Sequence, residues 1–147
     1  MKKQLLLILM TLLPMVAWAD EVEINGIYYN LNTDTKEAEV ARSPNSYTGN
    51  VVIPKKVTYY EVDYNVTSIG RDAFYYCNDL TSVNISNGVT LVGSCAFSDC
   101  SSLTSIIIPN SVMSIGEFAF FDCSSLMSVN IPNSLISIGN FAFMFCI

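Results

Sequence analysis

The second half of the chain is built on a repeat of 23 residues. Its last two full copies, Val89–Ser111 and Val112–Ser134, align without a gap and are identical at 14 of 23 positions. Val66–Gly88 is a looser copy, and Leu135–Ile147 begins a fourth. A period of roughly 20–30 residues is typical of a solenoid, in which each coil packs on the next. The columns that never vary are Gly70/Gly93/Gly116/Gly139, Ala73/Ala96/Ala119/Ala142, Phe74/Phe97/Phe120/Phe143 and Cys77/Cys100/Cys123/Cys146.

Each copy contains two apolar segments that are separated by turns. The pattern L-x-x-V-x-I, at Leu126–Ile131, predicts a short parallel strand whose apolar side chains point inward. Pro132 ends this strand, because proline cannot continue a hydrogen-bonded ladder. The pattern V-x-x-I-G, at Val112–Gly116, predicts a second extended piece, ended by a glycine with a positive φ. The A-F-x-x-C run that follows predicts one helical or 3₁₀ turn with its Ala, Phe and Cys side chains inside.

The complete unit, V-x-x-I-G-x-x-A-F-x-x-C-x-x-L-x-x-V-x-I-P-x-S, resembles the BspA-type leucine-rich repeat of bacterial surface antigens. The resemblance covers the chain from Val66 to its C-terminus. It implies a right-handed leucine-rich-repeat solenoid of short parallel β-strands and short helical or 3₁₀ turns. It also implies a secreted or surface-displayed module for adhesion or partner binding. One copy carries the pattern with Val112, Ile115, Gly116, Ala119, Phe120, Cys123, Leu126, Val129, Ile131, Pro132 and Ser134.

Met1–Ala19 has the composition of a secretory signal peptide. Lys2 and Lys3 precede an apolar run, and Ala17-Trp18-Ala19 forms a small-residue cleavage site. The apolar run is shorter than the roughly 20 residues that span a bilayer, which disfavours a retained anchor. We therefore expect cleavage after Ala19 and a secreted or cell-surface location, with no membrane span in the mature chain.

The charge balance argues against two classes of partner. Without Lys2 and Lys3 the chain keeps 5 basic residues against 13 acidic ones, a difference of −8. An acidic chain without a basic cluster is poorly suited to bind nucleic acid or anionic membranes.

Residues 20–65 differ in composition from the repeats and predict an N-terminal β cap. Asn25-Gly26 lies between alternating apolar segments, which indicates a hairpin, and Glu37–Arg42 alternates as a further strand. Val51–Pro54 repeats the I-P of the later copies and predicts a degenerate first rung. The nine-residue insertion Val57–Asn65 is expected to form a small hairpin. A solenoid needs an atypical end unit to shield its first coil, and this segment suits that purpose.

The chain stops at Ile147, where the fourth copy would enter its strand. An uncovered coil exposes apolar surface and strand edges, which favours association. We expect either a piece of a longer array, which is the favoured interpretation, or a partner that covers this end. Five large side chains of the last coils should be partly exposed: Phe118, Phe121, Phe141, Met144 and Phe145. They could form an aromatic contact patch. The favoured interpretation is that further coils would cover them.

Four of the five cysteines occupy one column of the repeat. Neighbouring rungs lie about 4.8 Å apart, which permits a disulfide between Cys77 and Cys100 or between Cys123 and Cys146. The favoured interpretation is a buried ladder of reduced thiols that act as small apolar groups, because periodic inward placement already explains the column. Cys95 lies outside the column and is a candidate free thiol. The spacing does not resemble a zinc site, whose cysteines come in close pairs.

Catalytic chemistry has little support in this sequence. The chain contains no histidine, which excludes Ser-His-Asp, Cys-His and histidine-metal sites. Asp99 and Asp122 are the only carboxylates at matching positions of adjacent coils. We interpret them as water-facing turn residues rather than as a shared cation or acid–base site. We predict no catalytic, cofactor or metal site and expect the chain not to be an enzyme.

The outward positions of the predicted strands form a candidate partner-binding strip. They carry hydroxyl, amide and apolar side chains without charge, on the concave face where leucine-rich repeats usually bind. We expect protein or glycan partners at the cell surface to bind there. The alternative is a structural or truncated fragment of a longer array with no independent binding activity. The strip consists of Thr81, Ser82, Asn84, Thr104, Ser105, Ile107, Met127, Ser128 and Asn130.

Overall fold

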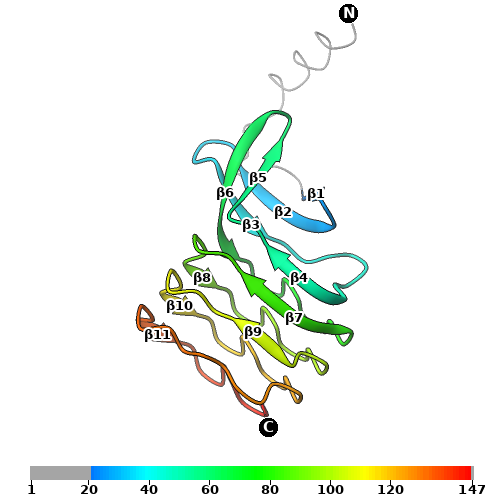
Figure 1. Ribbon diagram of the computed structural model, residues 1–147, viewed down its shortest axis with the longest axis vertical. Coiled ribbons are helices and arrows are strands. Elements are labelled where there is room, and N and C mark those ends of the chain that lie inside the picture. The colour runs from blue at the N-terminus through cyan, green and yellow to red at the C-terminus, as the bar shows by residue number, and fades with distance from the viewer. Residues whose placement is uncertain (1–20, 147) are drawn as a thin grey trace, which may run out of the picture.

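The computed structural model describes residues 21–146, so the predicted signal peptide lies outside the described residues. The chain winds into stacked coils whose strands form two sheets (Figure 1), and the predicted solenoid is confirmed. None of the described residues belongs to a helix long and apolar enough to cross a membrane. The larger sheet contains β1 (Val22–Ile24), β2 (Ile27–Asn32), β3 (Glu37–Val40), β5 (Lys56–Tyr59), β6 (Val62–Ile69), β8 (Leu91–Val92), β10 (Ser114–Ile115) and β11 (Ser137–Ile138), and the smaller contains β4 (Gly49–Ile53), β7 (Leu80–Ile85) and β9 (Ser105–Ile107).

Both sheets run along the stack as parallel ladders. The larger sheet has the order β1-β2-β3-β6-β8-β10-β11, and along this order its pairs are parallel from β3 onward. β5 lies off this order and pairs antiparallel with β6. The smaller sheet has the order β4-β7-β9 and is parallel throughout. Leu91 pairs with Ser114, and Ser114 pairs with Ser137. The 23-residue period of the sequence is therefore the register of the ladder.

Two hairpins and one additional coil precede the repeats. Each hairpin turns on two residues with positive φ, Asn25 and Gly26 between β1 and β2, and Tyr60 and Glu61 between β5 and β6. This is the geometry of a type I′ turn, and both predicted hairpins are confirmed. β3 pairs with β6 and β4 with β7, both in parallel. Residues 37–53 thus form a coil with a strand in each ladder, whereas the sequence indicated only its second strand as a rung.

The invariant glycines lie where the backbones of two coils touch. The predicted positive φ is wrong, because only Gly26, Gly49 and Gly88 have one. A Cβ at Gly116 would instead lie 2.5 Å from the backbone nitrogen of Ser94, closer than real Cβ atoms approach. The N–H of Gly116 donates to the carbonyl of Val92 at 2.8 Å. The absent side chain thus lets one coil bond directly to the preceding one.

The A-F-x-x-C run forms successive β-turns, so the predicted helical or 3₁₀ turn is not observed. Phe118 (φ 55°) and Asp122 (φ 52°) are left-handed, and such residues do not fit a right-handed helix. Alternate N–H groups point along the stack instead of along the chain. They donate to carbonyls of the following coil, in the pairs Phe118–Asn140 at 3.0 Å, Phe120–Ala142 at 2.7 Å and Asp122–Met144 at 2.9 Å. The turns therefore act as a third ladder.

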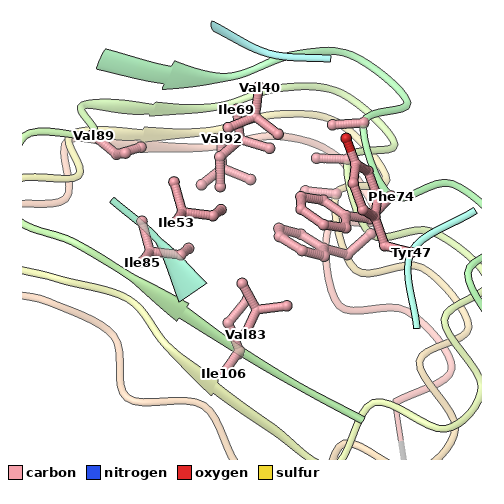
Figure 2. Packing of buried hydrophobic residues seen from close by; sticks show 14 of the residues in the cluster. Val40, Tyr47, Ile53, Ile69, Phe74, Val83, Ile85, Val89, Val92 and Ile106 are labelled. Atoms are coloured by element: carbon pink, nitrogen blue, oxygen red, sulfur yellow. The ribbon is translucent and has the colours of Figure 1, made fainter. Parts of the chain in front are cut away.

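The invariant phenylalanines stack into one aromatic column. The ring centroids of Phe74 and Phe97 are 4.8 Å apart, those of Phe97 and Phe120 are 5.1 Å apart, and those of Phe120 and Phe143 are 5.0 Å apart. Tyr47 packs on Phe74 at 4.5 Å and extends the column at its N-terminal end (Figure 2). Stacked aromatic pairs contribute about 0.5–1.5 kcal/mol each beyond the apolar area that they bury.

Aliphatic side chains fill the space between the two sheets. Val40, Ile69 and Val92 come from the larger sheet, and Ile53 and Ile85 from the smaller (Figure 2). All five are at most 2% exposed. Each coil therefore contributes apolar side chains from both of its strands to one continuous core.

The cysteine column is a ladder of free thiols, as the favoured interpretation predicts. The thiol of Cys100 donates to the carbonyl of Phe74 at 3.0 Å, and that of Cys123 donates to the carbonyl of Phe97 at 3.1 Å. Cys146 repeats the contact one coil later, on Phe120 at 3.1 Å. The thiols thus combine a small apolar volume with a weak hydrogen bond between coils.

The third predicted strand, Leu126–Ile131, is not formed as a strand and joins neither sheet. Val129 is half-buried and Ile131 is 45% exposed, although both were predicted to point into the core. Among residues 21–146 no later coil supplies a strand beside this segment. With one neighbour instead of two, the segment has fewer contacts to hold it against β9.

Substitution of Gly116 by alanine should destabilise the fold. The new Cβ would overlap the backbone at Ser94, and overpacking of this kind costs about 1–3 kcal/mol. We expect a midpoint of thermal unfolding lower by roughly 3–10 °C. The control is Ser124→Ala, at an exposed turn position. Equal melting temperatures for the two variants would contradict the role given to the glycine.

Substitution of Tyr47 by phenylalanine should also destabilise the fold, although it keeps the ring stack. The Tyr47 hydroxyl donates to the carbonyl of Ala41 at 2.8 Å and accepts from the N–H of Tyr28 at 3.0 Å. Leaving such groups unpaired costs about 1–3 kcal/mol. Chemical denaturation of Tyr47→Phe measures this loss, and Tyr60→Phe, where the ring is 78% exposed, is the control. A Tyr47→Phe protein as stable as the control variant would show that the hydroxyl is dispensable.

Stability should fall with increasing pH above about 8.5, where unfolded thiols ionise. Burial raises the pKa of the Cys123 thiol to about 12 and also raises the pKa of Cys100. Between about pH 8.5 and about 12, the unfolded chain has lost thiol protons that the folded chain keeps. The free energy of unfolding therefore decreases by about 1.4 kcal/mol per pH unit for each thiol. Denaturant titrations measure the free energy of unfolding at each pH. Between pH 8.5 and 9.5 the slope of this free energy against pH should be shallower for Cys123→Ala than for the unsubstituted chain. An unchanged slope would exclude this origin of the pH dependence.

Candidate partner-binding face

The outward face of the smaller sheet presents the predicted strip to solvent. Thr81, Ser82 and Asn84 lie on β7, and Thr104 directly precedes β9. Ser82 is half-buried, and the other eight predicted residues are exposed. The remaining members lie on later coils, and the most exposed of them is Met127 at 83%. They are Ser105, Ile107, Met127, Ser128 and Asn130.

Three of the predicted residues meet in a shallow depression of about 490 Å³. Asn84, Ile107 and Asn130 come from three successive coils and line it together with Asn87 and Asn110. The remaining lining residues are Ile85, Ser86, Ile108 and Pro109. The depression thus has four amide side chains and no charged one. Each amide offers two N–H donors and one carbonyl acceptor.

Hydroxyl and amide side chains bond to one another at the N-terminal end of the strip. Asn50 Oδ1 accepts from Thr81 Oγ1 at 3.0 Å and from Ser82 Oγ at 2.8 Å. Thr104 Oγ1 donates to the carbonyl of Thr81 at 3.1 Å. These bonds hold the side chains at this end of the strip in a fixed orientation.

Two outward residues on β4 belong to the same face but were not among the predicted residues. Asn50 pairs with Ser82, and Val52 pairs with Asn84, so both belong to the same rows as the predicted residues. Val52 is 63% exposed. The Ile53-Pro54 match to later copies marks this rung and was the signal that could have found them.

The two stacked carboxylates are explained by the turn that they occupy. Asp99 has φ 60° and Asp122 φ 52°, a left-handed conformation that Asp tolerates better than most residues. Ser98 Oγ donates to Asp99 Oδ2 at 2.6 Å. Across the described part of the chain, no group of three or more His, Cys, Asp and Glu side chains has the arrangement of a metal site.

Cys95 is free and half-buried, and its surroundings do not favour a reactive thiolate. Burial raises the pKa of its thiol, and the negative charge of Asp72 raises it further. A thiol with a raised pKa is a weak nucleophile at neutral pH. The position therefore has no feature of a catalytic cysteine.

The aromatic side chains of the last coils form a partly exposed cluster, as predicted. The rings of Phe118 and Phe141 stack at 5.3 Å, and those of Phe121 and Phe145 meet edge-on at 5.2 Å. Phe141 is 55% exposed and Phe145 56%. The cluster lies on the turn ladder, away from the strip.

Several solved structures are similar to this chain. A leucine-rich repeat protein from Bacteroides capillosus is 28% identical with a TM-score of 0.74, over 82% of this chain and 88% of that one. One from Bacteroides ovatus is 37% identical with a TM-score of 0.77, over 87% of this chain and 33% of that one. The leucine-rich repeat protein of T. pallidum is 28% identical with a TM-score of 0.71, over 82% of this chain and 54% of that one. The chain thus spans about a third of the length of the Bacteroides ovatus protein and about half of the length of the T. pallidum protein.

A comparison with curated proteins finds no match. The sequence profile described as "BspA type Leucine rich repeat region (6 copies)" matches residues 49–147, well over half of the chain. Its first residue is the first residue of β4. The solenoid, the repeat pattern and this match agree, and the chain belongs to the family of BspA-type leucine-rich-repeat proteins.

Proposed function

We propose that the chain is an exported, non-enzymatic module that binds protein or glycan partners at the cell surface through the strip. Leucine-rich-repeat proteins are generally binding modules. The observation that carries the proposal is the amide-lined depression where Asn84, Ile107 and Asn130 meet. Polar groups converging in a concave site are the usual mark of a binding site.

The chemistry of the depression suits a neutral, polar ligand. Amide side chains donate and accept hydrogen bonds at once, as do sugar hydroxyls and peptide groups. Ile107, which is 57% exposed, adds an apolar contact beside the amides. The face has no charge with which to attract ionic ligands. Glycans and uncharged protein surfaces are therefore the partners that its groups match best.

The size of the strip limits the strength of a single contact. Four rungs at about 4.8 Å spacing and about 16 Å length present roughly 300 Å². A standard interface takes about 800 Å² from each partner. One face should thus bind weakly, and adhesion would depend on many copies acting together.

The sequence supports export and a surface location through Met1–Ala19, which has the charged start, apolar run and cleavage site of a signal peptide. Cleavage after Ala19 would release a mature chain of strongly acidic composition, which suits solubility outside the cell. The resemblance to bacterial surface antigens agrees with that location.

A second candidate role is structural. The last described coil exposes Ile136 (82%), Ile138 (50%) and Phe145 (56%), and β11 pairs only with β10. Such an end can associate with another coil or another copy. Light scattering on the purified chain distinguishes the roles: a monomer with a cooperative melt opposes the structural role, and concentration-dependent oligomers support it.

Placing lysine at both Asn84 and Asn130 should abolish partner binding through the strip. Two like charges in a neutral depression repel each other and leave ligand hydroxyls without their amide partners. An array of glycans and matrix proteins first identifies the ligands that the unsubstituted chain binds. We expect the double variant to bind those ligands at least roughly tenfold more weakly. The control is the double variant Asn45→Lys/Asn140→Lys, which adds the same charge at exposed sites elsewhere. Equal binding by both double variants would remove the strip as the binding site.

A further inference from the structure

The outer edge of β4 is an unpaired strand edge. β4 is the first strand of its sheet, and its only neighbour is β7. Ile53 accepts a hydrogen bond from Ser86 at 3.2 Å, and Gly49 donates one to Asp79 at 2.8 Å, so the odd-numbered residues face β7. In a parallel ladder the residues between them direct their N–H and C=O groups to the other side. These are Asn50 and Val52, and within residues 21–146 their amides donate to no turn, loop or side chain.

This edge lacks the features that normally protect a strand edge. Proteins usually shorten such edges or place charges or proline on them. The edge strand of the larger sheet, β1, follows that rule, with three residues that include Glu23. β4 has five residues, Gly-Asn-Val-Val-Ile, without charge or proline. An uncharged edge of this length is a ready template for another strand.

A groove runs along the same edge. Two adjoining depressions of about 380 Å³ and 330 Å³ share Asn25, Ile27 and Val52 as lining residues. One wall is β4 with the residues that flank it, and the other is the tip of the β1–β2 hairpin. Asn50, Val51, Val52 and Pro54 all line the two depressions, so the groove follows β4 along most of its length. Space and unpaired backbone groups therefore coincide.

We propose that β4 binds an extended peptide segment of a partner protein as an added strand that lies in this groove. An extended peptide is the ligand that offers N–H and C=O groups at the spacing of the strand edge. Alternate side chains of the segment would face the apolar groove residues Ile24, Ile27 and Val57. This site recognises backbone, whereas the strip presents side chains.

The probe is a display library of random seven-residue peptides, selected on the folded chain. Val52→Pro is the decisive variant, because it removes an N–H that faces away from β7 and spares the ladder, where proline is tolerated at an edge. Selected peptides should alternate apolar and polar residues and bind this variant at least roughly tenfold more weakly. They should bind Asn84→Lys/Asn130→Lys unchanged, which separates this site from the strip.

Amide hydrogen exchange keeps the proposal testable if Val52→Pro fails to fold. Amide hydrogen exchange of the unsubstituted chain should show fast exchange at Asn50 and Val52 and protection at both when a selected peptide is added. The proposal is overturned if no peptide is retained, if exchange at Asn50 and Val52 does not change, or if Val52→Pro folds and binds the peptides equally.

Discussion

Direct backbone contact between successive coils is the constraint on which the rest of this structure depends. The coils bond through both sheets and also through the turns, where the N–H of Phe97 donates to the carbonyl of Ala119 at 2.7 Å. Such bonds require neighbouring coils to stay about 4.8 Å apart on every side. That spacing is also the distance at which rings stack, and the centroids of Phe74 and Phe97 lie 4.8 Å apart. One distance therefore determines which side chains fit at each inward position: none at Gly116, a thiol at Cys123 and a flat ring in the phenylalanine column.

The inward positions were predictable from the sequence because each coil repeats the same environment. A side chain in the core contacts its counterpart 23 residues away, so the same residue type recurs, and Cys100 and Cys123 show their burial by recurrence alone. The two extended pieces of each copy were predictable for the same reason, since apolar residues recur at strand spacing. Asn25-Gly26 indicated its hairpin through residue types that adopt positive φ at low cost.

The backbone conformation of the turns was not predictable, because bonds between coils override local preference. Phe118 and Cys95 adopt left-handed φ values although neither residue type favours them. Their neighbours' carbonyl and N–H groups then point along the stack, and the coil-to-coil bonds offset the local strain. The glycine column was misinterpreted since glycine has two uses, positive φ and close approach, and sequence alone does not separate them. Tyr47 was missed for a related reason: it enters the aromatic column from outside the repeat.

Function in such a fold has to reside where stacking imposes no residue type. The core columns admit little change, whereas an outward residue such as Asn84 contacts only solvent and its row neighbours. The strip is therefore free to vary, and the packing of the core does not impose its amide-rich composition. At the N-terminal end of the smaller sheet, the outer backbone groups of β4 have no neighbouring strand among residues 21–146. The edge at Val52 offers hydrogen bonds that do not depend on side chains, so it suits an extended backbone, and the hairpin tip limits which segments fit. The two proposed binding surfaces therefore differ in chemistry, although both follow from the same parallel stack. The strip presents side-chain groups, and the outer edge of β4 presents backbone groups.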